Sequence, residues 1–131
     1  MKNVQICECC GAKIVSYKYR FNEGLLNCLV ALSRNNGKTI AQMGLSNSEY
    51  ASFHKLKYFS LAERHGEKNF ITLKGIYFLR GDLRIPEYVI IRKGEFIEAA
   101  EKSIFWWEAL KEIERRQYYV DQIKEGLKDE M

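Results

Sequence analysis

The chain has 131 residues, of which 47% are hydrophobic and 29% charged, a composition typical of one globular domain with a real core. It has no run of about 18 apolar residues and no apolar leader with a small-residue cleavage site. We therefore expect no membrane-spanning helix, no signal peptide and a cytoplasmic location.

The net charge of +4 is unevenly distributed along the chain. Residues 1–94 carry 15 Lys and Arg against 7 Asp and Glu, whereas residues 95–131 carry 6 against 10. A basic body with an acidic tail is expected if the body faces a polyanion, although small domains also acquire uneven charge by chance.

The first segment with a chemical signature is Cys7-x-x-Cys10-Gly11. Two thiolates at this spacing, followed by a glycine that permits a tight turn, form one zinc knuckle and resemble half of a zinc ribbon. A structural zinc needs four ligands, and no second Cys-x-x-Cys follows, so a vestigial turn without metal explains the pattern equally well. Alternatively, two chains can each contribute one knuckle to a shared four-cysteine zinc site. The other residues able to complete the shell lack diagnostic spacing: Cys9, Cys28, His54 and His65.

Residues 15–37 predict a strand followed by a helix. Residues 15–21 alternate weakly between apolar and polar, which favours a short strand. Apolar residues then recur at helical spacing from Phe21 to Leu32, and Cys28 falls on this stripe as a buried thiol. Asn35-Asn36-Gly37 ends the helix, because Asn and Gly accept the left-handed conformation.

Residues 39–59 predict two further helices joined by a tight turn at Gly44-Leu45. The first is short and spans Thr39 to Met43. The second runs from Asn47 to about Phe59, starts with a Ser46-x-x-Glu49 capping box and is expected to bury Tyr50, Phe53 and Leu56. Its outer face is small, polar and basic, which suits DNA readout, although an ordinary solvated face looks the same. The predicted DNA-reading residues are Asn47, Ser48, Ser52 and Lys55.

A hairpin is predicted next, because Leu61 to His65 and Phe70 to Thr72 flank Gly66-Glu67-Lys68-Asn69. Its rim carries Arg64, His65 and Lys68, which in a wing contact the phosphate backbone or the minor groove. Thr72 and Gly81 then bracket a short helix as its N-cap and its C-terminal stop.

The string Ile71-Thr72-x-Lys74-Gly75-x-x-Phe78-Leu79-x-Gly81 after a hairpin resembles the wing-to-helix junction of winged-helix transcriptional regulators. With Gly44-Leu45-Ser46 ahead of the long helix, this resemblance covers residues 21–81. The order of cysteine knuckle, these elements and the segment from Arg84 to Val89 also resembles small uncharacterised proteins of phage and prophage genomes. It implies a winged-helix fold, a cysteine knuckle and a phage origin, but no activity. The extra Cys9 and the acidic tail depart from the pattern.

The last third of the chain predicts a second hairpin and a long helix. Residues 87–92 and 95–98 pair through Lys93-Gly94 and are apolar enough to be buried on one face. Residues 99–131 keep amphipathic helical spacing. Adjacent tryptophans on one helix point to different sides, so we expect a dimer or partner interface, the alternative being that the helix folds back and both rings join the core. The predicted interface residues are Trp106, Trp107, Leu110 and Ile113.

The sequence therefore predicts an α+β protein with a cysteine knuckle and lead-in at residues 1–20, a winged-helix domain at 21–98 and a C-terminal amphipathic helix at 99–131. An enzyme is not expected, since two histidines without a nucleophile or carboxylate constellation support no catalysis. We expect a dimeric, phage-type transcriptional regulator that binds double-stranded DNA, with zinc as the one cofactor to consider. The alternative is a module that engages or inhibits a host protein of defence or transcription. A structural role in phage DNA packaging or assembly comes third.

Overall fold

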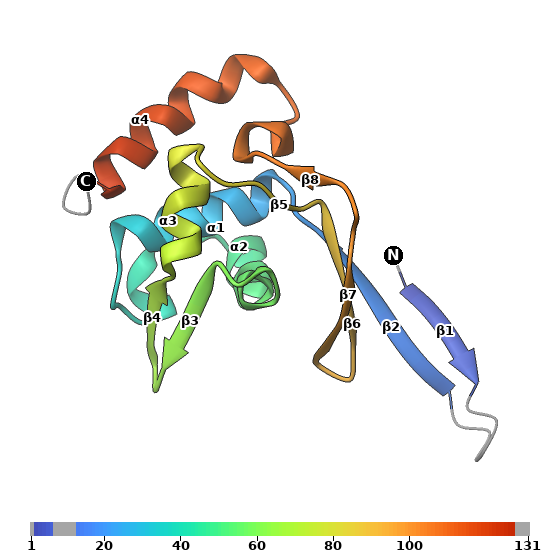
Figure 1. Cartoon of the computed structure of the whole chain (residues 1–131). Helices are drawn as coiled ribbons and strands as arrows, with labels where there is room; N and C mark the ends of the chain where they lie inside the picture. Colours follow the sequence, from blue (N-terminus) through green and yellow to red (C-terminus); the bar gives the residue numbers. More distant parts are fainter. Residues whose placement is uncertain (1, 7–12, 128–131) are drawn as a thin grey trace.

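The structure of the chain is a computed structural model that describes residues 2–6 and 13–127, with side chains from residue 16 onward. It is a mixed α+β fold in which helices and 3₁₀ turns pack beside small antiparallel sheets (Figure 1). The strands are β1 (Lys2–Ile6), β2 (Lys13–Arg20), β3 (Ala62–His65), β4 (Lys68–Ile71), β5 (Ile85–Pro86), β6 (Tyr88–Arg92), β7 (Glu95–Ala99) and β8 (Ser103–Ile104). The helices are α1 (Glu23–Arg34), α2 (Asn47–Ser52), α3 (Leu73–Arg80) and α4 (Arg116–Leu127), with 3₁₀ segments η1 (Ile40–Met43), η2 (Phe53–Phe59), η3 (Trp106–Ala109) and η4 (Ile113–Arg115).

The largest sheet joins strands that lie far apart in the sequence, in the order β1-β2-β6-β7, with every pair antiparallel. In its central pair Tyr17 lies opposite Ile91 and Tyr19 opposite Val89. The β6–β7 pair carries a bulge, so that Ile91 faces Phe96 and the intervening Ile97 is the extra residue. Strands β3 and β4 form a separate hairpin, and β5 pairs with β8.

Helix α1 is the centre of the core. It begins where the Asn22 side chain accepts a 2.9 Å hydrogen bond from the Leu25 amide, and it ends before Gly37, whose φ of 85° favours glycine. Helix α4 packs on α1, and so do α2 and η2 (Figure 1). The fully or almost fully buried leucines of α1 are Leu25, Leu26, Leu29 and Leu32.

Several local predictions are confirmed. The Ser46 hydroxyl accepts a hydrogen bond from the Glu49 amide at 3.3 Å, and the Glu49 carboxylate accepts one from the Ser46 amide at 3.1 Å, which is the predicted capping box. The hairpin turns at Gly66. The Thr72 hydroxyl caps α3 by accepting from Gly75 N at 3.0 Å, and α3 stops at Gly81 in the left-handed conformation. The hairpin at residues 88–99 also forms.

The prediction of one long helix over residues 99–131 is wrong. Ser103 and Ile104 instead pair with Ile85 and Pro86, two 3₁₀ turns follow, and a true helix starts only at Arg116. Helical spacing of apolar residues is compatible with consecutive single turns, so periodicity alone does not distinguish these from a continuous helix. This segment folds back onto α1 and α3 and supplies part of the core.

Two burial predictions are also wrong. Tyr50 is 57% exposed, and the second hairpin leaves Phe96 54% and Ile97 45% exposed, although Val89, Ile90 and Ile91 of the same hairpin are buried. In the part of the chain that the structure describes, no helix is long and apolar enough to cross a membrane.

Candidate nucleic-acid interface

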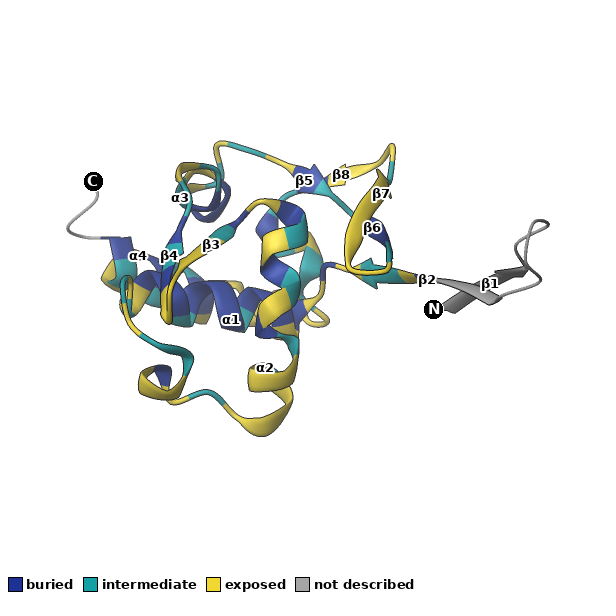
Figure 2. Cartoon of the chain, turned by 90° about the horizontal axis from the view of Figure 1, so that it is seen from below, coloured by how far each residue is buried: buried dark blue, intermediate teal, exposed yellow. Residues whose placement is uncertain are grey.

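The candidate surface is centred on α2 and η2, which lie between two hairpins. Segment η2 contacts β3 on one side and β6 on the other, and Figure 1 shows the β3–β4 and β6–β7 hairpins flanking it. None of the residues of α2 is buried, and in Figure 2 this helix is coloured almost entirely as exposed. A helix held between two hairpins with its outer side uncovered is free to contact a large ligand.

The change from α-helix to 3₁₀ geometry at Phe53 decides which side chains face outward. A 3₁₀ helix has three residues per turn, and the buried residues Phe53, Leu56 and Phe59 are spaced by three. The row of Ser52, Lys55 and Tyr58 is consequently half-buried, and the row that includes His54 and Lys57 is exposed. The predicted readers Asn47 and Ser48 are exposed, whereas Ser52 and Lys55 are partly covered.

Lys55 is directed toward strand β2. Its Nζ lies 4.9 Å from the centre of the Tyr19 ring, and the Tyr19 ring also meets Tyr58 at 5.8 Å between centroids. Burial, together with the nearby Tyr58 and Tyr17 rings, raises the pKa of Tyr19. The Lys55 ammonium is thus held against a neutral aromatic group, a favourable cation–π arrangement.

The three predicted wing residues are all exposed on the β3–β4 hairpin. The Arg64 Nε donates a 2.6 Å hydrogen bond to the Gly66 carbonyl, which holds the guanidinium at the turn. The His65 ring packs edge-on against Phe70 at 5.5 Å, and its Nε2 lies 3.8 Å from the Glu63 carboxylate. The rim is therefore basic but includes a carboxylate.

The hairpin is anchored firmly at its base. Asn69 is buried, its amide donates to the Lys38 carbonyl at 2.9 Å, and its carbonyl accepts from Gly37 N at 2.8 Å. The Asn36 side chain accepts from the Ile71 amide at 2.8 Å. The loop after α1 thus fixes the hairpin relative to the core, so that its charged tip is presented on a rigid support.

A small cavity of about 120 Å³ separates η2 from the hairpin. Its lining includes two cations, Lys57 from η2 and Arg64 from β3, together with His54 and the carboxylate of Glu63. The structure therefore brings the exposed row of η2 and the β3–β4 hairpin to one surface. The predicted reader Lys55 lies in the neighbouring row, and sequence reasoning missed His54 and Lys57. The spacing of three between Phe53, Leu56 and Phe59 is the signal that identifies them.

The predicted zinc ligands Cys7 and Cys10 lie outside the described residues. Cys28 is fully buried in α1, where its Sγ donates to the Glu49 carbonyl at 3.4 Å, and burial raises the pKa of this thiol to about 12. His54 and His65 both lie on the surface. Within residues 2–6 and 13–127, no three His, Cys, Asp or Glu side chains gather where they can hold a metal ion.

The four predicted interface residues do not share one surface. Trp106 is 4% exposed and belongs to the core, Trp107 and Leu110 are half-buried, and Ile113 is 61% exposed. Trp107 stacks on Phe105 at 4.4 Å, and Arg116 lies 4.6 Å from its ring centre.

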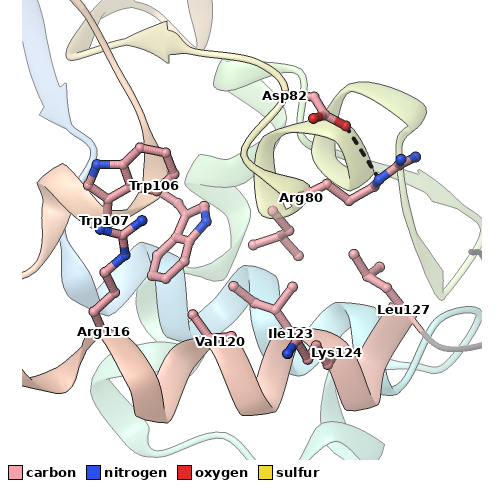
Figure 3. A pocket seen from close by; sticks show the side chains of 10 residues that line it. Arg80, Asp82, Trp106, Trp107, Arg116, Val120, Ile123, Lys124 and Leu127 are labelled. Carbon is pink, nitrogen blue, oxygen red and sulfur yellow. Dashed lines mark ion pairs between the residues drawn. The ribbon is translucent and has the colours of Figure 1, made fainter.

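Figure 3 shows the two tryptophans at one end of a groove between α3 and α4, with a volume of about 410 Å³. Arg80 and Asp82, 3.4 Å apart, lie on the opposite side from α4. Both indoles are therefore used mainly within the molecule, and Ile113 is the member of the four that presents most of its side chain to solvent.

Comparisons of the chain with protein-family models, with curated proteins and with solved structures find no match. What the surface around η2 binds is therefore inferred from its geometry and chemistry.

Proposed function

We propose that the chain is a DNA-binding protein of winged-helix architecture, in which α2 and η2 enter the major groove of duplex DNA and the β3–β4 hairpin serves as the wing. The observation that carries the proposal is the order and placement of parts: α1, η1, a capped α2–η2 segment and a hairpin beside it. This order is that of a helix-turn-helix followed by a wing.

In this arrangement the residues divide into two groups. Asn47, Ser48, His54 and Lys57 are exposed along α2 and η2 and supply short polar and basic contacts to base edges and phosphates. Arg64, His65 and Lys68 on the hairpin hold the phosphate backbone and set the register. The surface also carries Glu49, Glu63 and Glu67, so its net positive charge is modest and tight, purely electrostatic binding is not expected.

A transcriptional regulator of phage type fits this chemistry, with two copies of the chain binding two half-sites. We expect a second copy to dock through Ile113 in η4 and Tyr118 in the first turn of α4, which are 61% and 56% exposed. The same exposed apolar pair favours the second candidate function, in which the chain engages a host protein. A chain whose partner is a host protein remains monomeric alone and loses that partner on Ile113→Glu.

The decisive experiment measures the affinity for a duplex of about 25 base pairs by fluorescence anisotropy at several salt concentrations. Each phosphate contact contributes about −0.9 to the slope of log affinity against log salt, so the double variant Arg64→Ala, Lys68→Ala should reduce the steepness by about 2. The matched control is Lys111→Ala, Lys124→Ala, which removes two exposed lysines from the C-terminal segment. A wild-type affinity that does not respond to salt, or equal slopes for both double variants, contradicts the proposal.

A further inference from the structure

A second feature of the surface is a row of aromatic rings beside η2. Tyr17 and Phe96 flank Ile91 on neighbouring strands, since Tyr17 pairs with Ile91 and Ile91 pairs with Phe96. Directly paired residues project from the same face of a sheet, so the two rings share the face that η2 covers in part. We call Tyr17, Tyr19, Tyr58 and Phe96 the aromatic patch.

The three tyrosine rings of the patch lie close to one another, and both Tyr17 and Phe96 are open to solvent. Tyr17 and Tyr19 stack at 6.3 Å with an interplanar angle of 18°, and Tyr19 meets Tyr58 at 5.8 Å. Tyr17 is 42% and Phe96 54% exposed. The core beneath is already closed by Val89 and Ile91, which are 1% and 2% exposed. The outer aromatic surface is thus not needed to fill the core and is available to a ligand.

Positive charge surrounds the patch. Lys55 lies 4.9 Å from the ring centre of Tyr19, and Lys57 lies 5.0 Å from that of Tyr58. A hollow of about 290 Å³ next to Tyr58 and Phe96 is lined by Lys57 and Lys74, and no carboxylate is among the described residues that line it.

The acidic residues of β7 point the other way. Glu95 pairs with Arg92 and Glu98 with Ile90, and these positions belong to the opposite face of the sheet from Ile91 and Phe96. The opposite face carries these carboxylates together with Lys18 and Arg92. The face of the aromatic patch does not carry Glu95 or Glu98 and combines its rings with Lys55 and Lys57. This combination attracts a ligand that has both flat rings and negative charge.

We propose that the aromatic patch binds the unpaired nucleotides of a single-stranded nucleic acid. Bases stack on Tyr17 and Phe96, while the phosphates between them meet Lys55, Lys57 and Lys74. Exposed aromatic rings combined with a basic surface are the usual means by which proteins hold unpaired bases without reading their sequence. A duplex keeps its bases stacked inside, so it cannot use these rings. The activity therefore goes beyond the proposed duplex binding: the two share Lys57, but only the binding of unpaired bases depends on the rings of Tyr17 and Phe96.

The test uses the full chain and four fluorescent probes in anisotropy titrations: a dT 12-mer, a U 12-mer, an abasic 12-mer of the same charge and the 25-base-pair duplex. The wild type should bind dT or U 12-mers at least several-fold more tightly than the abasic strand, because only they can stack. Tyr17→Ala and Phe96→Ala should each weaken binding of the dT and U 12-mers by roughly tenfold and leave the affinity for the abasic 12-mer unchanged. Tyr17→Phe, which keeps the ring, should bind like the wild type.

The matched control is Tyr77→Ala, which removes a 40% exposed tyrosine from α3 and should change none of the affinities. Preference for the dT or the U strand assigns the source as DNA or RNA, and equal binding assigns a surface that accepts both. Equal affinity of the wild type for based and abasic strands overturns the proposal, as does wild-type affinity in Tyr17→Ala and Phe96→Ala. Failure of the duplex proposal is distinguished by a separate measurement, the salt slope of duplex binding by the double variant Arg64→Ala, Lys68→Ala.

Discussion

The two flanks of α1 differ in how completely they are covered. On one flank α4 lies against the helix and closes the core, so that Tyr119 and Leu127 are fully buried. On the other flank α2 and η2 cover α1 but leave their own outer side open, with Tyr50 57% exposed. The same amphipathic helix thus supports a closed scaffold and an open surface. The stabilising contacts therefore lie on one side of the helix, and the surface that we propose to bind DNA lies on the other.

The closed flank is held by specific contacts as well as by packing. The Tyr119 hydroxyl donates to the Asn27 side chain at 2.8 Å, and Arg115 forms a 2.7 Å ion pair with Glu23, which is itself almost completely buried. Gly126 allows α4 to approach α1 so closely that a Cβ at this position would collide with the Ser33 side chain. These contacts join residues about 90 positions apart in the sequence, such as Asn27 and Tyr119.

The largest expected effect compares a tyrosine from each flank. Tyr119→Ala should lower the free energy of unfolding by about 3–5 kcal/mol, since it empties a fully buried ring site and leaves the Asn27 side chain without its donor. Tyr50→Ala, at an exposed position, should change it by less than about 0.5 kcal/mol. Urea unfolding followed by circular dichroism measures both. Similar losses in the two variants would show that the flanks do not differ as described.

A second variant tests the close approach of α4. Gly126→Ala should destabilise the fold by roughly 1–2 kcal/mol, because the added methyl meets Ser33 Oγ and Cβ while Ser33 is fixed by its 2.6 Å hydrogen bond to the Val30 carbonyl. An open helix would respond oppositely, since Ala is the better helix former. The double variant Ser33→Ala, Gly126→Ala should recover part of the loss. A stabilising Gly126→Ala contradicts the tight packing of this flank.

On the open flank, the 3₁₀ geometry of η2 predicts that two lysines contribute unequally to the salt dependence of duplex binding. Lys57→Ala should reduce the salt slope of duplex binding by about 1, since its exposed ammonium is free to release a counterion on contact with a phosphate. Lys55→Ala should reduce it less, because Lys55 is half-buried whereas Lys57 is exposed; a tyrosine ring lies at a similar distance from both ammonium groups, 4.9 Å for Lys55 and 5.0 Å for Lys57. Neither variant should shift the urea midpoint appreciably. The opposite ranking would favour an α-helical pitch through residue 59.

The smallest effect is confined to alkaline pH. Burial raises the pKa of Tyr119 from 10.0 to about 12, with the carboxylate of Glu23 acting in the same direction. The folded chain keeps this proton where the unfolded chain releases it, so the contribution of Tyr119 to stability is intact below pH 10 and is lost as the pH rises through 10 to 12. Tyr119→Phe should make this fall shallower. Burial raises the pKa of Cys28 from 9.0 to about 12, so this thiol adds a separate fall in stability that begins near pH 9 and persists in Tyr119→Phe. An unchanged slope in Tyr119→Phe contradicts the assignment.

Features that depend on a few neighbouring residues were predictable. The capping box of Ser46 and Glu49, the Thr72 cap and the two hairpins follow from local hydrogen bonding and turn chemistry, which the residues concerned carry with them. The placement of Arg64, His65 and Lys68 on an exposed hairpin follows for the same reason. The exposure of His54 and Lys57 in one row does not follow from the sequence pattern, because an α-helix has 3.6 residues per turn whereas the packing of Phe53, Leu56 and Phe59 selects three.

The sequence by itself therefore determined the α+β class, the order of the helices and hairpins and the separation of a basic body from an acidic tail. Only the tertiary structure decided where the C-terminal segment packs and which residues form the aromatic patch. Residues 103–104 pair with β5, and the segment that follows closes over α1, because burying Trp106 and Tyr119 there outweighs the local preference for one long helix. The patch unites Tyr17, Tyr58 and Phe96 across strands distant in sequence, a juxtaposition that depends on long-range register.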